Sequence, residues 1–89
     1  MTPQQLESKL TRFLELLSLY NEEHWYQFFL EAKSSLDSGD TFGALRKIRS
    51  AYGGMGSIND ALYFTGAPTK IAIEGFTLRD ELSELSRWH

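Results

Sequence analysis

The residues with the clearest potential for chemistry lie in one short segment, GGMGSIND, at positions 53–60. Three of its first four residues are glycines, which adopt left-handed backbone conformations without steric cost. Successive backbone N–H groups in such a loop can form a concave site for an anion. Exposed polar side chains there could also bind a partner. The predicted binding surface consists of Arg49, Met55, Ser57, Asn59 and Asp60.

A purely structural role for the same segment is the alternative, and the sequence favours it. Gly53 or Gly54 can end the preceding helix in a left-handed conformation. The side chains of Asn59 and Asp60 can bond to nearby backbone groups and hold the loop in shape. Nucleotide-binding patterns do not fit, because a P-loop needs Lys-Ser or Lys-Thr after its glycines and the dinucleotide fingerprint needs a different glycine spacing.

Catalytic and metal-binding patterns are not found in the sequence. The chain has two histidines, His24 and His89, and no cysteine. A Ser57–His24–Asp60 triad can be written from residue types alone, but the spacing gives no reason for these side chains to meet. Metal-ligand spacing of histidines and the acidic pattern of a calcium loop are also missing from the sequence. We therefore predict a protein that is not an enzyme and holds no metal or cofactor.

The composition is that of an ordinary globular protein. The chain has 89 residues and a net charge of −3, with an isoelectric point near 5.3. This charge argues against nucleic acid as a partner, because phosphate-binding proteins usually present a basic face. A signal peptide and a membrane span are not recognisable in the sequence. We expect one cytoplasmic helical domain over residues 1–89, to which a homodimer interface would add stability.

Apolar residues at helical spacing predict the elements that must position the loop. Helices are expected over residues 3–20, 22–37 and 41–52, and a last helix begins at Thr77. Between them, two short apolar runs at 61–64 and 70–73 flank the turn signal TGAP and predict a β-hairpin. The expected fold is therefore mainly α, a compact bundle of about four helices with a glycine-rich loop and one short hairpin.

Local signals mark the helix ends and the core. Asn21 and Gly39 are suited to left-handed C-terminal caps, and Asp40 or Thr41 is suited to an N-cap. The basic residues near position 49 lie at a helix C-terminus, where the helix dipole favours positive charge. The aromatic core is expected on the second helix, in the side chains of Trp25, Phe28 and Phe29.

The run YGGMGSINDALYF, preceded by a helix pair containing His24-Trp25, resembles a small bacterial family of unknown function. Members of that family share a Tyr/Phe-Gly-Gly-Met-Gly-Ser-x-Asn-Asp core, and the resemblance covers most of the chain. The KIAIEGF segment departs from it, since the family is expected to have a more polar loop there. The resemblance implies a shared core motif and no established activity.

Two functions from different classes follow from these observations. The first is a protein-interaction module, in its concrete form an immunity or antitoxin-like binder, because acidic side chains could meet a basic partner. Those side chains are Glu22, Glu23, Glu31, Asp37 and Asp40. The second is a small-ligand or anion-binding protein that uses the Gly53–Asp60 loop.

Overall fold

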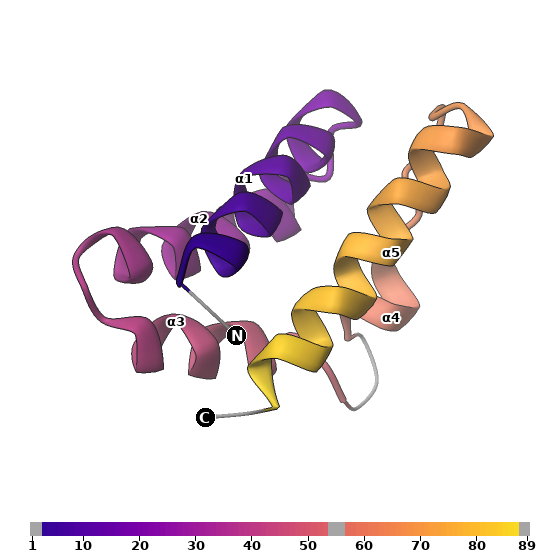
Figure 1. Cartoon of the computed structure of the whole chain (residues 1–89). Helices are drawn as coiled ribbons and strands as arrows, with labels where there is room; N and C mark the ends of the chain where they lie inside the picture. The colour runs from indigo at the N-terminus through magenta and orange to yellow at the C-terminus, as the bar shows by residue number, and fades with distance from the viewer. Residues whose placement is uncertain (1–2, 54–56, 88–89) are drawn as a thin grey trace.

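The structure of this chain consists of helices connected by short segments. It is a computed structural model that describes residues 3–53 and 57–87, without the side chains of Pro3 and Asp60. Four of the described helices are long and one has a single turn (Figure 1). In chain order they are α1 (Pro3–Leu19), α2 (Glu23–Asp37), α3 (Thr41–Arg49), α4 (Ile58–Ala61) and α5 (Thr69–Ser86). The prediction of a mainly helical bundle is confirmed.

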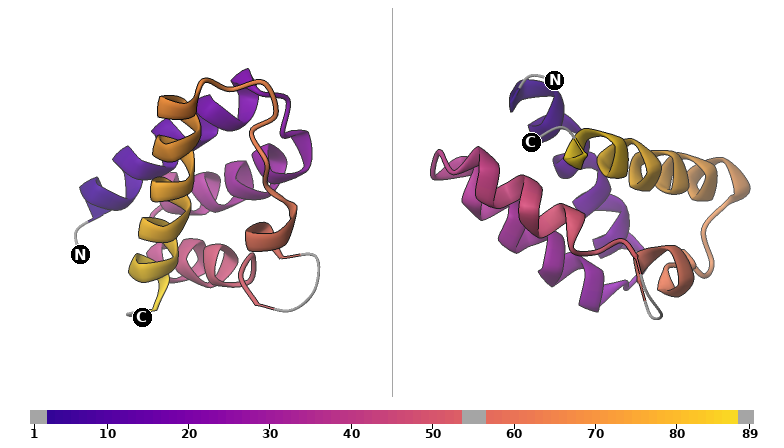
Figure 2. Two further views of the ribbon diagram at one scale, coloured as in Figure 1. Left: turned by 90° about the vertical axis from the view of Figure 1, so that its right-hand side faces the viewer. Right: turned by 90° about the horizontal axis from the view of Figure 1, so that it is seen from below.

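The helices pack as a folded-back pair with further helices against it. α2 returns beside α1 after a short turn and also packs against α3. α5 lies across the bundle and packs against both α1 and α3. The left panel of Figure 2 shows the segment from α4 to α5 running along the side of the molecule. This arrangement leaves one side of the α1–α2 pair uncovered by another described helix.

The helix ends follow the predicted capping residues. Asn21 and Gly39 adopt φ values of 58° and 91°, the left-handed conformation that ends α1 and α2. Asp40 is the N-cap of α3, and its carboxylate accepts a hydrogen bond from the backbone N–H of Gly43 at 2.8 Å. These caps are confirmed, and they set the short connections that fold α2 onto α1 and α3 onto α2.

Aromatic side chains form the centre of the core, and two of them come from α2, the helix for which the sequence predicts an aromatic core. Phe29 is fully buried and Trp25 is buried, while the ring of Phe13 meets that of Phe29 edge to face at 5.0 Å. Phe28 is only partly buried, and the ammonium of Lys47 lies 4.2 Å from the centre of its ring. The expectation of a core aromatic is therefore confirmed for Trp25 and Phe29, whereas Phe28 lies at the edge of the core.

The predicted β-hairpin is wrong, and the described residues contain no strand. The second apolar run, 70–73, forms the first turns of α5, which begins at Thr69 rather than at Thr77. Gly66 turns the chain at a φ of 88°, and Pro68 is the N-cap of the helix. Gly75 lies inside this helix, where a larger residue does not fit because a Cβ would collide with the ring of Phe64. A glycine that resembles a break in the sequence is thus a packing site.

The described residues also bear on membrane spans and metal sites. Within residues 3–53 and 57–87, no helix has the length and apolar character needed to cross a bilayer. The same part of the chain contains no group of three or more histidine, cysteine or acidic residues that could hold a metal ion.

Candidate functional site

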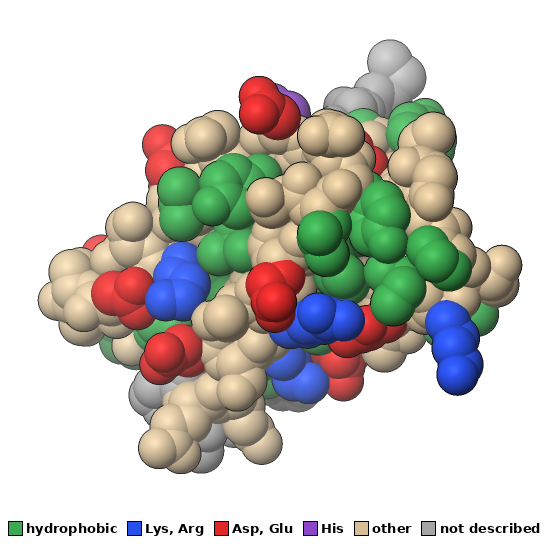
Figure 3. Space-filling model, turned by 90° about the horizontal axis from the view of Figure 1, so that it is seen from above, with side chains coloured by type: hydrophobic (Ala, Val, Ile, Leu, Met, Phe, Trp, Pro, Cys, Tyr) green, Lys and Arg blue, Asp and Glu red, His purple; other side chains and the backbone are tan. Residues whose placement is uncertain are grey.

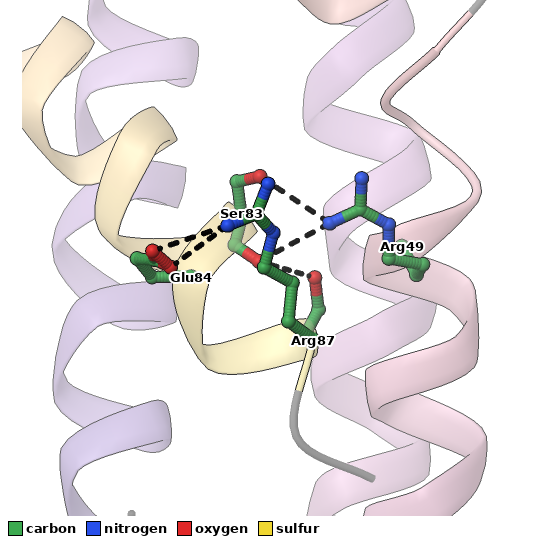
Figure 4. Close-up of polar contacts among 5 residues, drawn as sticks. Arg49, Ser83, Glu84 and Arg87 are labelled. Carbon is green, nitrogen blue, oxygen red and sulfur yellow. Dashed lines mark hydrogen bonds and ion pairs between the residues drawn. The ribbon is translucent and has the colours of Figure 1, made fainter.

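The predicted loop surface is only partly assembled as expected. Arg49, at the end of α3, donates from its guanidinium to the backbone carbonyl of Ser83 at 3.3 Å and to the Ser83 hydroxyl at 3.4 Å (Figure 4). Asn59 is exposed on α4 and makes no side-chain hydrogen bond to the described residues. Arg49 therefore joins α3 to α5, while Asn59 is exposed at the surface.

The other predicted residues of this surface contribute less. Ser57 is buried and precedes α4 as its N-cap, but its hydroxyl makes no capping hydrogen bond. Its carbonyl accepts the N–H of Ala61 at 3.0 Å. Met55 and the side chain of Asp60 lie outside the described part of the chain. The structure thus places Arg49 and Asn59 at one end of the bundle, near Ser83. The predicted binding surface of all five residues stays a prediction, because two of them lie outside the described part.

A small hollow of about 280 Å³ lies beside Asn59, and its lining is polar. The other lining residues are Asp80, Ser83, Glu84 and Arg87, all at the end of α5 or just after it. The guanidinium of Arg87 pairs with Glu84 at 3.4 Å (Figure 4), and Asp80 pairs with Arg79 at 3.0 Å. An anion in this hollow would have to compete with the carboxylate that already faces Arg87.

The region where α3 meets α5, here called the α3–α5 seam, contains Arg49, Tyr52, Arg79 and Ser83. The Tyr52 hydroxyl donates to the backbone carbonyl of Arg79 at 2.6 Å, and burial raises the pKa of this phenol above its ordinary value. Gly53 follows at a φ of 95°, and the N–H of Ile58 donates to the carbonyl of Ala51 at 2.9 Å. The prediction that Gly53 caps the preceding helix is wrong, because α3 ends at Arg49 with Ser50 as its C-cap, and Gly53 instead turns the chain three residues later; Gly54 lies outside the described residues.

The acidic residues proposed to meet a basic partner are mostly occupied within the fold. One carboxylate oxygen of Glu22 accepts the backbone N–H groups of Tyr63 and Phe64, at 3.1 and 3.0 Å. It thereby holds Phe64 at a positive φ of 48°. Asp40 caps α3, and the two remaining pairs are Lys33–Asp37 at 3.0 Å and Lys47–Glu31 at 2.9 Å. Glu23 is exposed and has no such contact among the described residues.

A groove of about 530 Å³ lies between α1 and α2, on the side that no other described helix covers. Its apolar part is formed by buried Leu14, half-buried Tyr26 and Leu30, and Leu19, which is 66% exposed. The polar lining residues are Thr11, Glu15, Ser18, Lys33, Ser34 and Asp37. We call this site the α1–α2 groove. Figure 3 shows the molecule from above the view of Figure 1, a face that includes α1, α2 and α5, with hydrophobic side chains gathered among charged ones.

Two neighbouring hollows extend this groove along the helices. One shares Thr11 and Glu15 with it and continues toward the start of α1. The other shares Ser18 and Tyr26 and continues toward the turn between α1 and α2. The open surface therefore follows the α1–α2 pair along its length rather than forming a single closed pocket.

A strong ion pair lies at the edge of this surface. The guanidinium of Arg12 binds the Glu74 carboxylate with two nitrogens, at 2.7 and 2.9 Å, and so connects α1 to α5. The hydrogen bonds from Arg12 lower the pKa of Glu74, and those contacts in turn raise the pKa of Arg12. This arginine is therefore already matched by a carboxylate.

The α1–α2 groove was not predictable from the sequence. The available signal was Leu19, Tyr26 and Leu30, three apolar residues that do not lie at the centre of either helical core stripe. Such residues are common on surfaces when they occur singly. Only the packing of α2 against α1 shows that they line one hollow with Leu14.

Comparison with known proteins finds one family. A family model described as "Domain of unknown function (DUF6966)" matches residues 18–70, from the end of α1 to the start of α5. No curated protein and no solved structure matches the chain.

Proposed function

The chain belongs to the DUF6966 family of domains of unknown function, and we propose that it is a protein-interaction module that binds a segment of a partner protein in the α1–α2 groove. The observation that carries this proposal is the apolar lining of an open groove. Leu19 remains 66% exposed beside partly buried Tyr26 and Leu30. Contiguous apolar surface of this kind is typical of binding sites, because covering it removes apolar area from water.

The concrete form of the proposal is a bacterial, cytoplasmic immunity or antitoxin-like binder. Such a protein needs a rigid surface and no reactive group of its own. The turn at Asn21 and the Phe13–Phe29 ring contact support a rigid α1–α2 pair. This form of the proposal predicts that the partner has an activity that falls when the domain binds.

Small-ligand or anion binding at the loop is the second candidate, and it has weaker support. What favours it is the position of Asn59 and Arg87 in one polar hollow. Against it, Arg49 donates to Ser83 and Arg87 faces Glu84. A ligand-induced rise in melting temperature that is lost in Asn59→Ala and retained in Leu19→Ala would support this candidate.

Site-specific photo-crosslinking tests the main proposal. A photoreactive amino acid is placed at Leu19 or Leu30 in the full chain, and the protein is irradiated inside the cells that naturally produce it. The control position is Phe42, which is 62% exposed on α3 and does not line the groove. We expect one partner protein to be linked from both groove positions and not from Phe42. Equal capture from Phe42, or no capture from the groove, would contradict the proposal.

A further inference from the structure

The walls of the α1–α2 groove restrict the backbone conformation of its occupant. Both walls are α-helices, whose main-chain groups are hydrogen-bonded within each helix. An extended peptide would find few main-chain partners there, and burying its amides without hydrogen bonds is costly. A helical peptide satisfies its own main-chain groups before it docks. The geometry therefore favours a helix.

The spacing of the lining residues agrees with this conclusion. On α1 the lining falls at residues 11, 14, 15, 18 and 19, and on α2 at 26, 30, 33, 34 and 37. These are the i, i+3 and i+4 positions that form the ridges of helix surfaces. From residue 26 to residue 37 the wall is roughly 16 Å long, about three turns of a docked helix. A third helix can pack between these two ridges.

The charges along the groove and its two extensions define the flanks of that helix. The two cations along this surface, Arg12 and Lys33, are already matched by Glu74 and Asp37. Glu7 and Glu23 are exposed and make no ion pair with a described residue. Glu15 lies 3.6 Å from an arginine that Glu74 binds more closely. The unmatched charges on this surface are therefore carboxylates, which favour a basic partner.

From these observations we infer that the occupant is an amphipathic helix of a partner protein, with an apolar stripe flanked by lysine or arginine. This inference rests on the proposed function and specifies its partner. The apolar stripe covers Leu14, Leu19, Tyr26 and Leu30, and the basic flanks face Glu15 and the carboxylates beyond the groove.

A second copy of the chain fits the groove less well. Its most basic described helix is α3, with Arg46, Lys47 and Arg49 in the last turn. However, the apolar side chains Ala44, Leu45 and Ile48 of that helix are buried in its own core. Phe42 is the large exposed hydrophobic residue of α3, and a single ring cannot cover a groove about three turns long.

Two designed peptides test the inference on the full chain. Both have 18 residues and the same leucine stripe at helical spacing, and they differ only in having lysine or glutamate flanks. Fluorescence anisotropy measures their affinities, and circular dichroism measures the helix formed on binding. We expect the lysine-flanked peptide to bind at least about tenfold more tightly at low salt, with the difference shrinking as salt screens the charges.

Matched variants locate the electrostatic contribution. Glu15→Lys and Glu31→Lys change the net charge equally, but only Glu15 lines the groove. We expect Glu15→Lys to weaken binding of the lysine-flanked peptide by about 3–10-fold, and Glu31→Lys by less than about twofold. Leu19→Glu should abolish binding. Equal weakening by both lysine variants would overturn the inference.

Further outcomes separate this inference from the proposed function. If crosslinking in cells captures a partner through an extended or acidic segment, the proposed function stands and this inference fails. The inference also fails if the glutamate-flanked peptide binds as tightly as its lysine counterpart, or if neither peptide binds. A concentration-dependent dimer that Leu19→Glu disrupts would assign the groove to a second copy and would overturn it as well.

Discussion

Polar groups at the α3–α5 seam and along the α1–α2 groove are used in different ways. At the seam, Arg49 and Tyr52 reach across to backbone carbonyls of α5. Along the groove and its extensions, Glu7 and Glu23 make no ion pair with the described residues, and Leu19 is largely exposed. Side chains that are engaged within the fold stabilise it, whereas the open apolar groove, with Glu7 and Glu23 along its extensions, is where we propose that a partner binds. Substitutions should therefore lower stability in one region and binding in the other.

The largest loss of stability is expected where α5 contacts the preceding segment. In Gly75→Ala, the new methyl group collides with the Phe64 ring, so we expect a loss of about 2–3 kcal/mol in the free energy of unfolding. In Gly53→Ala the added Cβ meets no described atom within 4 Å. The left-handed backbone alone then costs about 1–2 kcal/mol. Denaturant unfolding of both variants measures the difference, and equal losses would contradict this packing role for Gly75.

The neighbouring carboxylates Glu22 and Glu23 allow a direct comparison of an engaged with an unmatched group. Glu22→Ala leaves the N–H groups of Tyr63 and Phe64 without their acceptor, so we expect a loss of about 1–3 kcal/mol. Glu23→Ala removes an exposed carboxylate and should change stability by less than about 0.5 kcal/mol. Chemical denaturation distinguishes them. If the two variants unfold alike, the Glu22 contacts do not stabilise this segment.

These local contacts show how far the sequence could predict the structure. The first three helices and the caps at Asn21 and Gly39 were predictable, because they depend on periodicity and on residues that tolerate positive φ. The start of α5 was not, since the role of Gly75 depends on Phe64, eleven residues earlier along the chain but adjacent in space. Short-range patterns do not report such contacts.

The candidate site shows the same limit. Sequence patterns drew attention to the polar residues near Arg49, but they could not show that this arginine donates to Ser83, which lies 34 positions away. The α1–α2 groove arises only when residues from two helices meet, and each of its apolar residues resembles an ordinary surface residue when taken singly.

A smaller loss of stability is expected at the seam hydroxyl. Tyr52→Phe removes the hydrogen bond to the Arg79 carbonyl and should cost about 1 kcal/mol at neutral pH. Because the folded pKa of Tyr52 is raised, its stabilising contribution is complete below pH 10 and is lost as the pH rises further. Tyr52→Phe should therefore unfold with less dependence on alkaline pH than the parent, whereas the exposed Tyr63→Phe should follow the parent.

The smallest change is expected at Asn59, which is exposed and makes no side-chain hydrogen bond within the described part of the chain. Asn59→Ala should alter the free energy of unfolding by less than about 0.5 kcal/mol. A loss near 1 kcal/mol in thermal or denaturant melts would show instead that this side chain holds the loop in shape.

Mapping the binding surface by backbone amide NMR tests the central claim most directly. The isotope-labelled full chain is titrated with the lysine-flanked peptide, and the shift of each amide signal is followed. The groove account predicts the largest shifts at residues 11–19 and 26–37, with the amides of Arg49, Asn59 and Ser83 unchanged. Shifts confined to Arg49, Asn59 and the end of α5 would contradict it and would place binding at the loop.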